Sequence, residues 1–311
     1  MPEMPEVQTT VNGLRDTITD LTIKDVWTDL SKKTVSRPDY RDTIKYLPFF
    51  ETFKKAVSGK RVISTTRRAK NILIEIEGGH TILVHLKMTG HLLYGIYEYN
   101  QKQNMWHISP KEKNDALRDP YNRFIHVVFT FDNGRHLALC DSRKFGKVTL
   151  VKTEHIHTSK HTQNLGPEIL EQSFTLQTFV HQLSKKPNGK IKTILMDQTV
   201  MAGIGNIYSD EALWLTDIHP NSIVTKIPKN EMPKLFLAVK KVLNNGIDFG
   251  GDSMSDYRRI DGTPGQFQLK HNAYRLTKEK CKKPRCKGDI IKTVIGGRSA
   301  HFCDTHQKLY M

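Results

Sequence analysis

The sequence lacks the long apolar segment that a membrane-spanning protein needs. No run of about 18 apolar residues occurs in the 311 residues, which excludes a transmembrane helix. The chain also lacks, at its start, the basic stretch followed by an apolar one that marks a secretory signal. We therefore expect a cytoplasmic protein with no membrane partner.

Cysteine is scarce, because the chain contains only four. Cys140 stands alone in an apolar stretch and the other three lie near the C-terminus, which does not fit a disulfide framework. The C-terminal segment has the pattern Cys281-x4-Cys286-x16-Cys303-x2-His306, with a strand-like hairpin between the two pairs. Four such ligands can surround zinc tetrahedrally and leave no position open for a substrate. The spacing predicts one structural Zn²⁺ per chain.

Acidic residues are too few to balance the basic ones. The 48 Lys and Arg outnumber the 32 Asp and Glu, so the formal net charge is +16. Residues 268–311 contain eleven basic and three acidic residues, so half of the excess lies in the last 44 residues. A polyanion is the natural partner, because each Lys or Arg placed on a phosphate releases a condensed counterion. The 37% hydrophobic content excludes a merely disordered basic tail.

Hydrophobic periodicity divides the chain into segments of different character. Pro5, followed by Val7 and Val11 at helical spacing, predicts an N-terminal helix with one buried face. From about residue 22 to 152 the pattern alternates around glycine-containing turns, and several hairpins in one domain predict a β-sandwich or barrel. Residues 94–123 interrupt this pattern with a polar stretch, which we expect to be a surface insertion.

The rest of the chain is mostly helical. Apolar residues three or four apart predict four helices after residue 160, and a glycine-rich loop at 249–267 precedes the cysteine segment. The sequence thus predicts an α+β protein with three domains. They are an N-terminal β-sandwich with its helix (1–155), a helical domain (156–268) and a C-terminal β-hairpin zinc finger (269–311).

The start of the chain offers an amine nucleophile. Methionine before proline is readily removed, which would leave Pro2 as a free secondary amine beside Glu3 at the start of a helix. An α-amino group has a pKa near ~8, and the helix dipole would lower it further. Such an amine can form an iminium with a carbonyl-like carbon while the carboxyl group moves a proton. These residues alone are equally compatible with an ordinary chain start.

A second weak signal lies between two predicted helices. The glycines of Gly203-x-Gly205-Asn206 would let a phosphate approach the N-terminus of the following helix. A tight interhelical turn explains them equally well. Lys192, on the preceding helix, is by default a solvated lysine.

The separate motifs together resemble one known family. The start MPEMPEV resembles the MPELPEV start of the formamidopyrimidine-DNA glycosylase and endonuclease VIII family. The further blocks that resemble this family are RRAK (67–70), HLKMTG (85–90), DSRKFG (141–146), DQTVMAGIGNIYSDEAL (197–213) and GGRSAHFC (296–303). They occur in the family's order and span essentially the whole chain.

The resemblance implies a bifunctional DNA glycosylase and abasic-site lyase, a monomer that acts on damaged double-stranded DNA. Pro2 would attack C1′ of the damaged nucleotide, Glu3 would act as general acid/base, and Lys70 would assist strand cleavage by β,δ-elimination. The residues implied to bind DNA are Met88, Arg143 and Phe145, which would fill the gap left by the flipped base, and Lys192, Asn206 and Arg298, which would hold phosphates. The helical domain would be of the helix-two-turn-helix type, with a loop from Gly250 to Phe267 near the flipped base.

The chain departs from the family pattern in a few places. Lys87 and Ser142 replace a common glycine and proline, four residues rather than two separate the first zinc-ligand pair, and His306 replaces a cysteine. The start MPEMPEV, rather than MPEG, favours the branch that removes oxidised purines, namely 8-oxoguanine and formamidopyrimidines. Two alternatives stay open: an endonuclease VIII-like enzyme for oxidised pyrimidines, and a non-enzymatic zinc-hairpin protein that binds nucleic acid.

Overall fold

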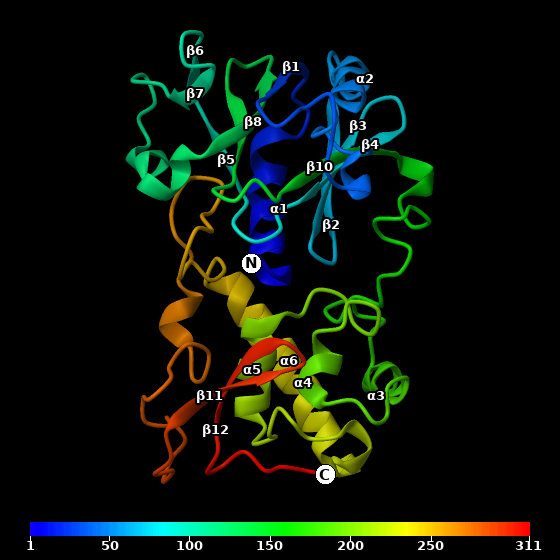
Figure 1. Ribbon diagram of the computed structural model, residues 1–311, viewed down its shortest axis with the longest axis vertical. Coiled ribbons are helices and arrows are strands. Elements are labelled where there is room, and N and C mark those ends of the chain that lie inside the picture. The colour runs from blue at the N-terminus through cyan, green and yellow to red at the C-terminus, as the bar shows by residue number, and fades with distance from the viewer. The chain divides into compact units, whose positions relative to one another are not determined.

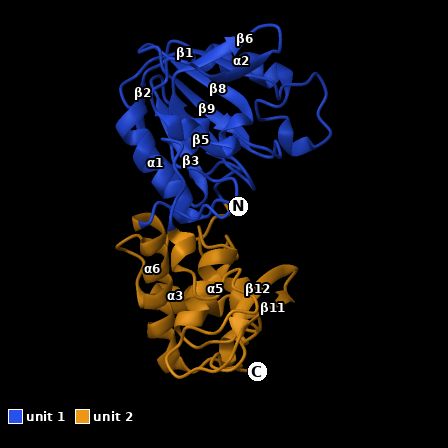
Figure 2. Cartoon of the chain, turned by 90° about the vertical axis from the view of Figure 1, so that its left-hand side faces the viewer, with its two compact units in different colours: residues 1–163, 249–266 blue, residues 164–248, 267–311 orange.

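The computed structural model describes residues 1–311, which form two compact units. Unit 1 comprises residues 1–163 and 249–266, and unit 2 comprises residues 164–248 and 267–311 (Figures 1 and 2). The chain therefore returns to unit 1 once, through the loop 249–266, before it ends in unit 2. Two compact units do not show which segments fold independently. The domain boundaries predicted at 155/156 and 268/269 therefore stay a prediction.

Unit 1 is built around a β-sandwich, which confirms the predicted fold class. One antiparallel sheet contains β1 (Ile23–Thr28), β8 (Ile125–Phe131), β9 (His136–Cys140) and β5 (His91–Gly95), in that order. The other contains β10 (Lys147–Lys152), β4 (His80–His85), β3 (Asn71–Ile76) and β2 (Val62–Arg68). The two hairpins predicted from alternating residues are β3–β4 and β8–β9.

The N-terminal helix α1 (Met4–Ile18) packs into the core of this sandwich. Val7, Val11, Leu14 and Ile18 are fully buried among side chains from both sheets. Their spacing of three and four residues places them on one face of the helix. Burial of this face therefore fixes the position of the residues that precede the helix.

The prediction of alternating strands throughout residues 22–152 is wrong for one segment, which forms helix α2 (Leu47–Val57). Phe53 and Val57, four residues apart, are buried in the core. This helical pattern is only 11 residues long and is flanked by strands on both sides, so the surrounding period-two signal concealed it.

The segment 94–123 is more than a surface insertion. It forms the hairpin of β6 (Tyr97–Asn100) and β7 (Met105–Ile108) and the 3-10 helices η2 (Asp115–Arg118) and η3 (Pro120–Arg123). Tyr97 and Leu117 are each 3% exposed and pack with residues of β8 and β9 that point away from the sandwich core. The segment thus covers the outer face of one sheet, although most of its residues are polar.

Unit 2 contains the four predicted helices and the predicted hairpin. They are α3 (Leu176–Ser184), α4 (Ile191–Leu195), α5 (Asn206–Leu215), α6 (Met232–Asp248), β11 (Ile290–Ile295) and β12 (Arg298–Cys303). Gly296 and Gly297 join the two strands with φ angles of 56° and 73°, which suits a tight hairpin turn. Short 3-10 helices lie at Pro38–Tyr40, Thr153–His155, Val224–Lys226, Lys229–Glu231 and Phe267–Lys270. None of the helices is both long and apolar enough to cross a membrane.

Candidate active site and metal centre

The predicted nucleophile lies directly before helix α1. Pro2 is buried, and Glu3 is the N-cap residue with 2% of its surface exposed. The backbone N–H of Glu3 donates to Oε2 of Glu6 at 2.7 Å, and the N–H of Asp252 donates to Oε1 of the same carboxylate at 2.8 Å. Glu6 therefore joins the start of the chain to the loop 249–266. Sequence reasoning missed this role, although Glu3-x-x-Glu6 has capping-box spacing.

Lys70 lies in the tight turn between β2 and β3, beside helix α1. The preceding residue, Ala69, has a positive φ of 53°, which closes the turn. The Arg67 guanidinium donates to the carbonyl oxygen of Ala69 and to Oε1 of Gln8 on α1, each at 2.9 Å. Lys70 is 6% exposed. The turn that carries Lys70 is thus tied to the helix that follows Pro2 and Glu3.

Three predicted DNA-binding side chains of unit 1 are exposed at two neighbouring turns. Met88 is 38% exposed and Phe145 is 41% exposed, which is unusual for large apolar residues. The Arg143 guanidinium lies 4.6 Å from the centre of the Phe145 ring, over its face. An exposed Met, Arg and Phe have the shapes needed to replace a stacked base.

A single buried carboxylate connects these two turns. Asp141 accepts hydrogen bonds from the Thr89 hydroxyl and, at 2.6 Å, from the backbone N–H of Gly146. The backbone N–H of Arg143 donates to the hydroxyl oxygen of Thr89 at 3.2 Å. The turn with Met88 and the turn with Arg143 and Phe145 are therefore held together.

The departure at Lys87 has a local explanation. Lys87 has a φ of 57°, in the left-handed region that glycine adopts at least cost. Its backbone N–H donates to Nδ1 of His85 at 3.0 Å, which holds the turn in place. Because this bond requires an unprotonated Nδ1, it fits the His85 pKa, which burial lowers to about 3. Lys87 therefore adopts a left-handed backbone conformation that favours glycine, which is the residue common at this position in the resembled family.

The four predicted metal ligands form one cluster in unit 2. The ligand atoms of Cys281, Cys286, Cys303 and His306 all lie within 4.8 Å of one another. Sγ of Cys286 is 3.6 Å from Sγ of Cys303, and Sγ of Cys281 is 3.2 Å from Nδ1 of His306. Tetrahedral ligands at the usual zinc–sulfur distance of about 2.3 Å would be roughly 3.7 Å apart. The cluster thus has the dimensions of a four-coordinate metal site.

The surroundings of the cluster orient its ligands. Nε2 of His306 lies 3.3 Å from the carbonyl oxygen of Trp214, so this nitrogen carries the proton and Nδ1 is left to bind a metal. The backbone N–H of Gly288 donates to Sγ of Cys286 at 3.4 Å, and this bond lowers the Cys286 pKa. A Cβ atom on Gly288 would lie 2.7 Å from Sγ of Cys303, so the site requires glycine here.

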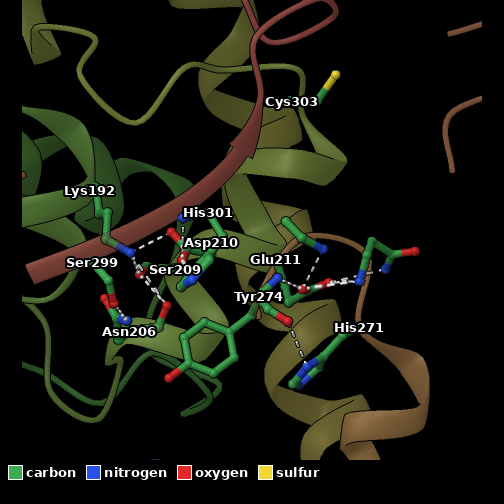
Figure 3. Close-up of polar contacts among 12 residues, drawn as sticks. Lys192, Asn206, Ser209, Asp210, Glu211, His271, Tyr274, Ser299, His301 and Cys303 are labelled. Carbon is green, nitrogen blue, oxygen red and sulfur yellow. Dashed lines mark hydrogen bonds and ion pairs between the residues drawn. The ribbon is translucent and has the colours of Figure 1, made fainter. Parts of the chain in front are cut away.

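Two of the predicted phosphate-binding residues of unit 2, Lys192 and Asn206, contact neighbours at helix α5 and strand β12 (Figure 3). Nδ2 of Asn206 donates to the Ser299 hydroxyl at 3.1 Å, and the neighbouring Arg298 is exposed at the hairpin turn. Lys192 is completely buried, and its ammonium pairs with the carboxylate of Asp210. In this arrangement Lys192 faces α5 rather than solvent, which differs from the solvated lysine that is the default expectation from sequence.

Helix α5 also holds the C-terminal hairpin and the segment that precedes it through two acidic residues (Figure 3). Oδ2 of Asp210 accepts from the backbone N–H of His301 on β12 at 3.0 Å. Glu211, 1% exposed, accepts from the backbone N–H groups of Asn272, Ala273 and Tyr274, each at 2.9 Å. Both carboxylates were missed from sequence, because the backbone N–H groups that they accept from lie more than 60 residues away in the chain.

Comparison with known proteins identifies the family. The model of the formamidopyrimidine-DNA glycosylase N-terminal domain matches residues 1–148, and that of the H2TH domain of the same enzymes matches residues 165–258. The formamidopyrimidine-DNA glycosylase of Herpetosiphon aurantiacus is 37% identical over 307 residues, which cover 99% of this chain and 100% of the relative. The chain belongs to the formamidopyrimidine-DNA glycosylase family. The enzyme of the same name from Heliobacterium modesticaldum is 35% identical over 99% of this chain and 100% of its own length.

Solved structures of formamidopyrimidine-DNA glycosylases (Fpg) have the same fold. The complex of Lactococcus lactis Fpg with DNA containing an abasic site has a TM-score of 0.78 at 29% identity, over 97% of each chain. A Lactococcus lactis variant bound to DNA containing Fapy-dG has a TM-score of 0.79 at 29% identity, over 97% of this chain and 98% of that one.

The two Fpg family models end before the metal cluster. Residues 259–311 lie beyond the matched ranges, whereas the full-length relatives cover them. The metal site of this chain is therefore supported by the geometry of its own four ligands.

Proposed function

We propose that this protein is a bifunctional DNA glycosylase and abasic-site lyase of base excision repair that removes oxidised purines, 8-oxoguanine and formamidopyrimidines. Membership of the Fpg family over the full chain length supports the activity and the substrate class. The single structural observation that carries the proposal is the start of helix α1. There a potential secondary amine precedes a buried carboxyl group, and the turn with Lys70 is bonded to Gln8 of the same helix through Arg67.

In the proposed reaction the Pro2 nitrogen, freed of Met1, attacks C1′ while the C1′–base bond breaks and the departing base takes up a proton. The Pro2 nitrogen then loses its own proton and the C1′–O4′ bond breaks with protonation of O4′, which opens the sugar and gives an iminium between enzyme and sugar. Glu3 exchanges protons with the sugar, a role that its burial beside the nucleophile favours. Lys70 lies near the helix start as a cation for the phosphate, so that elimination can break the strand on both sides of the sugar. The target nucleotide must first leave the duplex, because its sugar carbon cannot be reached while the base is stacked.

The DNA-binding roles follow from exposure. We propose that Met88, Arg143 and Phe145 fill the gap left by the flipped base, and that Asn206 and Arg298 hold the neighbouring phosphates. Lys192 would reach a phosphate only if its ammonium left Asp210, so its proposed contribution is to hold the start of α5, which carries Asn206. This activity would take place on DNA in the cytoplasm.

We propose that the metal bound at Cys281, Cys286, Cys303 and His306 is Zn²⁺, one ion per chain. Three thiols and an imidazole with tetrahedral spacing are a ligand set that zinc favours. Bound zinc would supply no chemistry to the reaction, because all four positions are taken by the protein. It would hold the hairpin that presents Arg298.

Borohydride trapping tests the mechanism. Reduction of the iminium should link the mature protein covalently to duplexes with 8-oxoguanine or an abasic site, and more weakly to one with thymine glycol. In Pro2→Glu the larger side chain prevents removal of Met1, so the cross-link should disappear. Pro5→Ala, which changes another proline of the same helix, should retain it. Trapping by Pro2→Glu equal to the wild-type level, measured on denaturing gels, would contradict Pro2 as the nucleophile.

A further inference from the structure

We propose that the insertion 94–123 sets the base specificity of this enzyme by holding the loop 249–266, and that Asp119 and Arg258 are its main positioning residues. The loop is the segment that the proposed function brings to the flipped base, so the inference rests on that function. Figure 1 shows the loop, in orange, beside the short helices of the insertion, in green. Both segments belong to unit 1.

The central contact is an ion pair between the buried Arg258 and the partly exposed Asp119. Arg258 is 6% exposed, and its Nε donates to Oδ2 of Asp119 at 3.2 Å. The guanidinium also lies 4.4 Å from the centre of the Tyr121 ring, over its face. A planar guanidinium that both stacks and pairs is held in one orientation, which a lysine could not reproduce.

Arg258 transmits this position to the loop itself. Its Nη1 donates to the carbonyl oxygens of Ser255, at 2.8 Å, and Tyr257, at 2.9 Å. The side chain is thus bonded to the insertion at Asp119 and to the backbone of its own loop. Removal of Asp119 would leave a buried cation with only neutral partners, which is costly.

Further contacts hold the backbone of loop residues 261 and 262 against the insertion. Nδ2 of Asn114 donates to the carbonyl oxygen of Asp261 at 2.8 Å. Gly262, with a φ of 86°, lies so close to the insertion that a Cβ atom would meet the backbone of Ala116 at 2.7 Å. The residues from Arg258 to Gly262 therefore fit closely against the insertion.

These contacts leave the tip of the loop, at residues 254 and 255, exposed to solvent. Met254 is 41% exposed and Ser255 is also exposed, whereas Tyr257 and Arg258 are buried. On the other side of the tip, the Ser142 hydroxyl donates to Oδ1 of Asp256 at 3.0 Å, from the turn that carries Arg143. The tip is thus held between the insertion and the turn expected to fill the gap in the duplex.

The consequence is selective for substrates that carry a base. A loop ordered in advance loses less conformational entropy when it closes on a flipped base. An abasic site offers no base for the loop to hold, so its cleavage does not draw on the contacts between loop and insertion. The insertion should therefore affect base excision and leave strand cleavage at a preformed abasic site unchanged.

The test compares two substrates with three single variants of the full chain and with the double variant of Asp119→Asn and Arg258→Met. Asp119→Asn removes the charge but retains an oxygen that can accept from the N–H of Tyr121, and Arg258→Met removes the other partner. Asp115→Asn is the matched control, because Asp115 lies in the same insertion and is exposed. Single-turnover rates and KM are measured on a duplex with 8-oxoguanine and on the same duplex with an abasic site.

For Asp119→Asn and Arg258→Met we expect kcat/KM for 8-oxoguanine excision to fall about tenfold, the change expected from one further loop residue to be ordered. Abasic-site cleavage should stay within about twofold of wild type, as should both activities of Asp115→Asn. The double variant should be no worse than Arg258→Met alone, because the two residues act as one unit.

Other results would overturn the assignment. Equal losses on the two substrates would indicate a general structural role, and unchanged excision in both variants would remove any role for the ion pair. The proposed function fails in a different way: wild-type protein that cleaves the abasic duplex but leaves 8-oxoguanine in place contradicts the substrate class itself, and with it this inference.

Discussion

At the scale of single residues, burial determines which groups carry a charge. His91, on β5, is 1% exposed, and burial lowers its pKa to about 4. The nearby Arg258 lowers this pKa further, whereas Asn122, Thr89 and Asp256 act in the opposite direction. Nε2 of the neutral imidazole lies 3.0 Å from Oδ1 of Asn122 in the insertion. The insertion is thus attached to the sandwich through an uncharged imidazole.

This burial predicts a dependence of stability on pH. Because the unfolded chain takes up a proton on His91 near pH 6.5 and the folded chain resists it until about pH 4, stability is lost as the pH falls. Between pH 7 and 5 the wild type should lose about 2 kcal/mol of unfolding free energy more than His91→Gln, whose amide does not titrate. Urea unfolding at both pH values measures the difference. Parallel losses in the two proteins would show that His91 is not the group responsible.

At the scale of elements, helix α5 is held to its neighbours by buried polar pairs as well as by apolar side chains such as Tyr208 and Leu213. Lys192 from α4 and His301 from β12 meet the same carboxylate, Asp210 on α5. Neither partner of the central pair is exposed to solvent. A buried pair of this kind specifies which strand and helix belong together, although its net contribution to stability is small.

Replacing only one residue of the Lys192–Asp210 pair should destabilise the protein far more than replacing both. Lys192→Met alone or Asp210→Leu alone leaves an isolated buried charge, and each should lower the unfolding free energy by about 3 to 5 kcal/mol. The double variant should recover most of this loss, because no unpaired charge is left. Denaturant unfolding of the four proteins gives the coupling energy directly. Additive losses in the double variant would mean that the two charges do not compensate each other.

At the scale of the whole molecule, the metal cluster lies within the most basic part of the chain. The segment 268–311 carries half of the net charge of +16 and all four clustered ligands. A metal bound by these ligands would therefore hold the basic side chains of this segment in fixed positions. The sequence charge indicates a polyanion as the partner, and under the proposed function an ordered hairpin would determine which phosphates Arg298 meets.

Metal removal is the corresponding test. The purified protein should contain about one zinc per chain, and chelation should weaken binding to lesion DNA and flatten its salt dependence by about one unit of log–log slope for each phosphate that the protein no longer binds. Cys303→Ala should resemble the chelated protein. Cys140→Ala, which changes the buried thiol outside the cluster, should bind zinc and DNA as wild type does. A folded protein without zinc, or equal affinity with and without it, would contradict this role.

Local patterns in the sequence predicted much of this structure. The strands at 71–76 and 80–85, the helix at 232–248 and the ligand pairs of the metal cluster each depend on neighbours in the chain. Helix α2 was missed because its short pattern lies among strands, and the buried anchors of the insertion were missed because few apolar residues stood among many polar ones. The contact of Glu6 with Asp252, the contacts of Glu211 and the pair of Asp119 and Arg258 could not be found locally, since these partners are 61 to 246 residues apart.

The imidazole of His306 packs against the indole of Trp214, which places a fluorescent side chain beside the metal cluster. The indole ring centre lies 5.6 Å from that of the imidazole, in edge-to-face contact. A metal bound at Nδ1 would place positive charge on this imidazole, so removal of the metal should change the emission of Trp214. The other two tryptophans, Trp27 and Trp106, both belong to unit 1. A change in tryptophan emission on chelation is therefore expected to come from Trp214.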